Sequence, residues 1–151
     1  MPDPMASRRT ENDIHRSAPV KLERLDHLAI HVTDVERAER FYMDVLGMER
    51  RMRLPDQTLL RLGDVSVGLM QAASLPPPDP SRLRSPLGKA HHAFLVTDEE
   101  FDHARTIVAA AAPVSDIVDW GNHRCFYFLD PDGNLLEIVT PPRPDVNPTE
   151  R

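Results

Sequence analysis

The sequence lacks the features that mark membrane proteins, disulfide-stabilised folds and nucleic-acid-binding proteins. Cys125 is the single cysteine among 151 residues, so the chain has no internal disulfide, and a reducing cytoplasm is the expected compartment. No apolar run approaches the roughly 20 residues needed to cross a bilayer, and the polar start of the chain lacks the apolar core of a signal peptide. A net charge of −6 with both signs interspersed argues against nucleic acid or an anionic membrane as the main partner.

Proline is abundant by contrast, and its distribution divides the chain. Between Leu75 and Gly88 the sequence carries five of its 15 prolines, which predicts a stiff linker rather than a regular element. Both ends of the chain have no hydrophobic period and are expected to be flexible tails. The expected parts are a tail (1–20), a first module (21–74), a linker (75–88), a second module (89–141) and a second tail (142–151).

The strongest internal signal is a repeat of strand length. The segment Asp26–Asp34 recurs in degraded form as Ala90–Asp98. The positions that match at one offset are His27/His91, Ala29/Ala93, Val32/Val96, Thr33/Thr97 and Asp34/Asp98. A duplicated unit with one histidine at the same point of each copy can bring both side chains to one cavity.

Each copy predicts the element order β-α-β-β-β, which makes the fold class α+β. The helix that follows the first strand is expected to be capped by Thr33 or Asp34 in the first module and by Thr97 or Asp98 in the second. The apolar face of the second helix should consist of Phe101, Ala104, Val108 and Ala111. The expected strands are Leu22–Val32, Met48–Leu54, Gln57–Leu62 and Val65–Gln71, then His91–Val96, Val114–Trp120, Arg124–Leu129 and Leu135–Thr140.

Strand alternation collects the side chains that carry chemistry on one face of each module. The face that should pack beneath the helices includes Leu28, Ile30, Val32, Phe126, Phe128, Leu136 and Ile138. The opposite face collects His27, His91, Tyr127, Cys125 and Glu137. A carboxylate flanked by apolar strand residues is costly to bury unless a cation or strong donors compensate it. Two imidazoles and one carboxylate suit Fe²⁺, Mn²⁺, Zn²⁺, Co²⁺ or Ni²⁺.

The same residues can also be interpreted without a metal. In that case both repeated histidines are core or surface residues with ordinary hydrogen-bond partners, and Glu137 pairs with an arginine. The repeat-matched histidine pair together with an isolated carboxylate favours metal binding. His31 shares the face of His27 and is expected to line the cavity, whereas His92 should pack toward the helix. Cys125 is interpreted as a small buried strand residue.

The chain resembles the vicinal oxygen chelate superfamily, which includes glyoxalase I, extradiol dioxygenases, fosfomycin-resistance thiol transferases and bleomycin-resistance proteins. In the first module the resemblance rests on residues 25–30 and on the helix containing residues 38–42 and ending at residues 45–48. In the second it rests on residues 91–94 and on the run Phe126–Glu137, which includes the turn Asp130-Pro131-Asp132-Gly133.

The resemblance implies two βαβββ modules forming a curved mixed sheet around a metal held by His27, His91 and Glu137. Substrates of this superfamily chelate the metal through two neighbouring oxygens. Tyr127 corresponds to a tyrosine that lines the site and could donate a hydrogen bond. Glyoxalase I takes a fourth ligand from the strand that corresponds to Val65–Gln71, which here contains no carboxylate or histidine.

A three-ligand set therefore favours a dioxygenase, with His123 as a possible hydrogen-bonding histidine beside the metal. A lyase, an isomerase or a thiol transferase on the same scaffold is the nearest chemical alternative. A protein that sequesters a drug or metabolite without catalysis is the alternative from another class. Because two curved four-stranded sheets need closure, we also expect a homodimer, with the modules paired either within one chain or across a swapped dimer.

Overall fold

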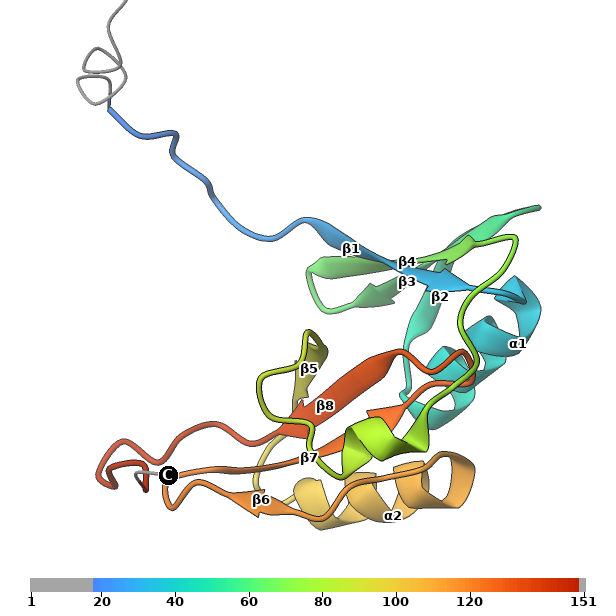
Figure 1. Ribbon diagram of the computed structural model, residues 1–151. Coiled ribbons are helices and arrows are strands. Elements are labelled where there is room, and N and C mark those ends of the chain that lie inside the picture. The colour runs from blue at the N-terminus through green and yellow to red at the C-terminus, as the bar shows by residue number, and fades with distance from the viewer. Residues whose placement is uncertain (1–17, 150–151) are drawn as a thin grey trace, which may run out of the picture.

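The computed structural model describes residues 18–149, which form two βαβββ modules in sequence (Figure 1). The first module contains β1 (His27–Val32), α1 (Val35–Arg40), η2 (Phe41–Val45), β2 (Glu49–Leu54), β3 (Gln57–Leu62) and β4 (Val65–Gln71). The second contains β5 (His92–Leu95), α2 (Phe101–Ala111), β6 (Val118–Asp119), β7 (Arg124–Leu129) and β8 (Leu135–Val139), and η3 (Pro80–Leu83) lies between the modules. The predicted α+β class with two βαβββ modules is confirmed.

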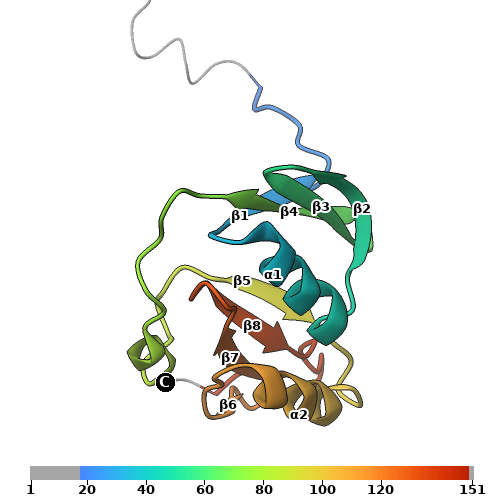
Figure 2. The same ribbon diagram turned by 90° about the vertical axis from the view of Figure 1, so that its right-hand side faces the viewer.

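Each module builds one four-stranded mixed sheet. The strand order is β1-β4-β3-β2 in the first sheet and β5-β8-β7-β6 in the second. The pairs β1–β4 and β5–β8 are parallel, and the remaining pairs are antiparallel. Figures 1 and 2 show the two sheets one above the other, with α1 beneath the first sheet and α2 along the outer side of the second. The opening strand of each module is therefore an edge strand.

One apolar core joins the modules. It includes the inward side chains of both sheets, such as Ile30 and Val67 from the first and Phe126 and Ile138 from the second. The predicted strand faces of β7 and β8 are confirmed, because the residues that alternate with these, such as Cys125 and Tyr127, belong to a separate apolar cluster. Full burial of large apolar side chains stabilises each by about 1.5–3 kcal/mol, so this shared core holds the two modules together.

The helices and two of the strands depart from the sequence-based expectation. The first helix begins at the predicted cap Asp34, whose side chain accepts from the Arg37 backbone N–H, but its second half is a π-helix. In the second module Glu100 takes the N-cap position, so the predicted cap at Thr97 or Asp98 is wrong. β1 starts at His27, five residues later than predicted, and the expected strand Val114–Trp120 contains only the two residues of β6. Ala111, predicted on the apolar face, is exposed.

The segments outside the modules also make defined contacts. The proline-rich segment between β4 and β5 includes the short 3₁₀ helix η3, whose Leu83 packs against the second sheet. Near the C-terminus, Arg143 and Thr149 donate backbone hydrogen bonds to the carbonyls of Asn122 and Trp120, which precede β7. None of the helices in residues 18–149 is long and apolar enough to cross a membrane.

Candidate metal centre

Glu137 is the buried carboxylate of the second sheet. It sits in the middle of β8, between β5 and β7, where its strand partners are Ala93 and Tyr127. The residue is only 8% exposed, and its neighbours along β8 are apolar. An ionised carboxylate in such surroundings requires a compensating donor or cation.

His91 provides the closest group to that carboxylate. Its Nε2 lies 2.7 Å from Glu137 Oε2, and its Nδ1 lies 2.6 Å from the carbonyl oxygen of Lys89. A carbonyl only accepts hydrogen bonds, so the Nδ1 atom carries the proton and donates it to Lys89. In the neutral imidazole the Nε2 lone pair then faces a carboxylate oxygen, and two acceptors at this distance need a proton or a cation between them.

Tyr127 and Cys125 complete the buried side of this pair. The Tyr127 ring meets the His91 ring edge to face, with centroids 5.2 Å apart. Burial, and secondly the Glu137 carboxylate, raises the pKa of Tyr127 well above its ordinary value of 10, so the phenol keeps its proton. The same two causes raise the pKa of the Cys125 thiol to about 12. The predicted grouping of these four side chains on one face is therefore observed.

His27 lies on the other sheet. Its side chain is 61% exposed, and its Nδ1 is 2.9 Å from Asp26 Oδ2. This hydrogen bond is the largest cause that lowers the pKa of Asp26, so the carboxylate accepts and the Nδ1 atom donates. The Nε2 of His27 is consequently left as a lone-pair donor for a metal, as in the carboxylate–histidine–metal arrangement. His27 and Asp26 line a cavity of about 550 Å³ on the open face of the first sheet.

Within the described part of one chain, the three predicted ligands do not converge. No group of three or more His, Cys, Asp or Glu side chains in residues 18–149 is close enough to hold a metal ion. The structure brings His91 to Glu137 but leaves His27 on the first sheet. The sequence left two arrangements open, with the modules paired within one chain or across a swapped dimer. In residues 18–149 of a single chain, the histidine-bearing faces of the two modules are not paired.

Among the described residues, His31, His92 and His123 form no hydrogen bond with His91 or Glu137. His123 precedes β7, where its Nδ1 is 2.6 Å from Asn122 Oδ1 and its ring stacks on Trp120. His31 is exposed at the far end of β1, and His92 is half-buried. The role predicted for His123 beside a metal thus has no contact with His91 or Glu137 to support it.

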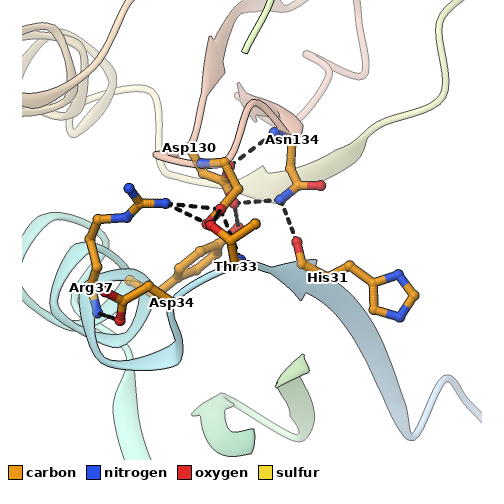
Figure 3. A network of polar contacts seen from close by, with 8 residues as sticks. His31, Thr33, Asp34, Arg37, Asp130 and Asn134 are labelled. Carbon is orange, nitrogen blue, oxygen red and sulfur yellow. Dashed lines mark hydrogen bonds and ion pairs between the residues drawn. The ribbon is translucent and has the colours of Figure 1, made fainter. Parts of the chain in front are cut away.

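Sequence reasoning missed an inter-module clasp, which we define as Tyr42, Thr33 and Arg37 of the first module with Asp130, Asp132 and Asn134 of the second. Figure 3 labels four of these residues, Thr33, Arg37, Asp130 and Asn134. The Tyr42 hydroxyl donates to Asp130 Oδ2 at 2.8 Å, and Asn134 Nδ2 donates to the same oxygen and to the carbonyl of His31. Burial raises the pKa of Asp130, and it also raises that of Tyr42.

Asp132 forms the second half of the clasp. Its Oδ1 accepts from the backbone N–H and the hydroxyl of Thr33 and from Arg37 Nη2. Gly133 follows with φ of +85°, and a Cβ there would lie 2.8 Å from Pro78 Cα. The turn Asp130–Gly133 contains two of these residues, but its sequence is accounted for by local turn chemistry alone and does not indicate a long-range partner.

The comparisons with known proteins agree with this architecture. Residues 24–138 match the Glyoxalase/Bleomycin resistance protein/Dioxygenase superfamily. The chain belongs to this superfamily. It is similar to the glutathione transferase FosA of Serratia marcescens, with 30% identity over 123 residues that cover 78% of this chain and 80% of that protein. It is also similar to a virulence protein of Salmonella typhimurium, with 31% identity over 129 residues that cover 82% of this chain and 88% of that protein.

Solved structures of the superfamily share the fold. The fosfomycin resistance protein FosX of Listeria monocytogenes matches with a TM-score of 0.67 and 20% identity, covering 80% of this chain and 95% of that one. At this identity the match supports the fold alone. Members of the superfamily are commonly metal-dependent enzymes acting on small molecules. The superfamily predicted from the sequence is therefore confirmed, and the particular reaction is a separate question.

Proposed function

We propose that the protein is a metal-dependent enzyme whose small substrate chelates a divalent cation through two neighbouring oxygens. The observation that carries the proposal is the contact between His91 Nε2 and the buried carboxylate oxygen Glu137 Oε2, which lie 2.7 Å apart. A cation bound by both would satisfy the lone pair and the buried carboxylate together. The proton of His91 Nδ1 is already committed to Lys89, which is the usual arrangement of a metal-binding histidine.

We further propose that His27 supplies the third ligand from a second copy of the chain. The open face of the first sheet carries His27 beside its cavity, and the second sheet carries His91 and Glu137 on the corresponding face. The edge strands β1 and β5 each have one unpaired side in residues 18–149. A two-fold dimer that sets the first sheet of one chain beside the second sheet of its partner would make two equivalent sites.

The metal would act as a Lewis acid that stabilises negative charge on the substrate oxygens. The residues of the chain would then bind and orient the substrate. Tyr127 keeps its proton at neutral pH and stands against His91, so it could donate to an oxygen that gains charge. Cys125 remains a thiol in contact with Glu137 and would help to orient that carboxylate.

The reaction that we favour is transfer of a thiol to an electrophile that bears such oxygens. The similarity to the glutathione transferase FosA supports it. The composition of β4 also supports it, because this strand carries no carboxylate or histidine that could act as the base in a reaction that moves a substrate proton. Gly68 lies at the centre of β4, and a Cβ there would point to Met70 and Leu59, which line the His27 cavity. No side chain is present there to act as base.

Dioxygenation is the second candidate reaction. The three-ligand set favours it, because about three coordination positions of an octahedral metal would remain open for substrate and oxygen. His123, the histidine proposed to assist it, stacks on Trp120 instead of contacting His91 or Glu137. We therefore rank dioxygenation after thiol transfer.

Metal content tests the proposed site. Wild-type protein should bind one divalent ion per chain, measured by elemental analysis after incubation with Fe²⁺, Mn²⁺, Zn²⁺, Co²⁺ or Ni²⁺ and desalting. His27→Ala, His91→Ala and Glu137→Ala should each lose it. His103→Ala removes an exposed histidine that pairs with Glu100 on α2, and this control should retain the ion. A wild-type protein that takes up none of these metals would instead favour a binding protein without metal chemistry.

Mixing two defective variants tests the shared site. Neither His27→Ala nor Glu137→Ala has a complete site as a homodimer, but a mixed dimer has one site with all its ligands. Random pairing of equal amounts should therefore restore about a quarter of the wild-type metal content. No recovery after verified subunit exchange would refute the contribution of His27 from the partner. A wild-type monomer in light scattering at micromolar concentration would refute it as well.

Product analysis separates the reactions. Metal-loaded protein should consume glutathione together with the epoxide fosfomycin, and it should turn over the hemithioacetal of methylglyoxal weakly or not at all. Oxygen consumption with catechols would move dioxygenation to first place. Robust conversion of the hemithioacetal would show that a residue outside β4 supplies the base.

A further inference from the structure

Arg51 occupies a β-bulge in the edge strand of the first sheet. The antiparallel register of β2 and β3 passes from Arg50 opposite Leu60 to Met52 opposite Leu59, which leaves Arg51 without a partner. Consecutive residues of a regular strand point to opposite faces. Arg51 and Met52 nevertheless line the same cavity, because an extra residue bends the strand and re-aims its side chain.

The cavity is the one that contains His27. The Arg51 side chain reaches across β3 to β4, where its Nη1 lies 3.0 Å from Ser66 Oγ. Ser66 is in turn the register partner of His27 in the parallel pair β1–β4. The guanidinium is therefore held beside the proposed metal ligand by a neutral hydroxyl, which occupies only one of its five N–H donors.

Arg51 differs in its partners from the other arginines of β2 and β3. Arg50 and Arg53 both pair with the buried Glu39, and Arg61 pairs with Glu49. Arg51 has no carboxylate within ion-pair distance among residues 18–149. The other charged groups that line the cavity are Asp26 and His27, which are hydrogen-bonded to each other. The guanidinium of Arg51 is thus available to bind an anionic group that enters the cavity.

We infer that Arg51 binds an anionic group of the substrate, so that the protein selects oxygen-chelating substrates that also carry a carboxylate, phosphonate or phosphate. The inference rests on the proposed metal site, because His27 shares the cavity and would hold the chelating end of the same molecule. A guanidinium can bind two oxygens of such a group at once, which orients the substrate relative to the metal.

Two hydroxamates with the same chelating group test the inference. Acetohydroxamate carries no charge beyond this group, whereas succinate monohydroxamate adds a carboxylate on a flexible chain. Binding of each to the Zn²⁺-loaded protein is measured by titration calorimetry. The wild type should prefer the carboxylated ligand about tenfold, the value of one charge-assisted hydrogen bond. Arg51→Met should remove this preference and leave the affinity for acetohydroxamate unchanged.

Arg61→Met is the matched control, because Arg61 lies on the same sheet but already has a carboxylate partner. It should keep the preference for the carboxylated ligand. Arg51→Gln is a second variant that retains a donor for Ser66 without the charge, and it should behave like Arg51→Met. Unchanged preference in both Arg51 variants, or equal wild-type affinities for the two ligands, overturns the inference and leaves the metal site standing. Failure of the wild type to bind Zn²⁺ overturns the proposed function, and the inference falls with it.

Discussion

Replacing Tyr42 by phenylalanine should destabilise the protein through the inter-module clasp. The hydroxyl is fully buried and donates to Asp130 Oδ2 across the junction of the two modules. Removing it leaves Asn134 as the remaining side-chain donor to that oxygen. A hydrogen bond to a buried charged group contributes about 1.5–3 kcal/mol, and we expect a loss of this order in the free energy of unfolding at neutral pH.

The loss should depend on pH because the folded protein raises the pKa of Asp130. Burial is the main cause of the rise, and the Tyr42 hydrogen bond opposes it. A carboxyl group with a raised pKa contributes stability below its unfolded value of 3.8, and this contribution is lost as the pH rises through the folded value. Tyr42→Phe raises the folded pKa further. Its cost should therefore be largest at neutral pH and should shrink as the pH falls toward 3.8.

Urea unfolding followed by the fluorescence of Trp120, the single tryptophan, measures both quantities. A double-mutant cycle with Asp130→Asn isolates the coupling between the two side chains from the effects of each change alone. Coupling near zero, or a cost of Tyr42→Phe that is the same at neutral and acidic pH, would refute the assigned hydrogen bond as the cause.

Three further predictions concern single sites. Gly133→Ala should lower the free energy of unfolding by at least about 1 kcal/mol, because the left-handed backbone disfavours a Cβ that would also meet Pro78; thermal unfolding should show a lower midpoint. Glu39→Gln should cost roughly 1–2 kcal/mol at neutral pH, discounted because its arginine partners are partly exposed. Burial raises the pKa of Glu39, but the hydrogen bonds and charges of its arginine partners outweigh burial, so the pKa is lowered. The stabilisation by Glu39 is therefore present above pH 4.5 and is lost as the pH falls through the folded pKa. In the acid range, the free energy of unfolding of the variant should depend less on pH than that of the wild type. The Cys125 thiol, buried and with a pKa of about 12, should react with iodoacetamide at neutral pH only as denaturant unfolds the protein, and rapid labelling of the native state would contradict its burial.

Local sequence pattern predicted much of this fold. The bounds of β3, β4 and β7 agree with the predicted strands residue for residue. Alternation in β8 correctly separated Leu136 and Ile138, which face the core, from Glu137, which faces His91. These features depend on the period of a single strand, and side chains along a strand point alternately to its two faces whatever lies beyond them.

The relation between the two sheets was not predictable in the same way. The repeat matched His27 to His91, but equivalence within each module does not determine how far apart the modules lie. The separation depends on the shared core and on the clasp, in which Asp130 and Asp132 contact residues 88 and 99 positions earlier in the chain. The bulge at Arg51 was equally hidden, because its side-chain direction is set by a register shift against β3.

The common core has a consequence for how the chain unfolds. Repeat proteins often lose their units one at a time, because each unit contacts only its neighbours. Here Phe41 of the first module packs against Phe128 of the second, and neither module could expose its inner face without exposing that of the other. The duplicated halves therefore form one cooperative unit, with a single unfolding transition and with the slowest amide hydrogen exchange in the strands of both.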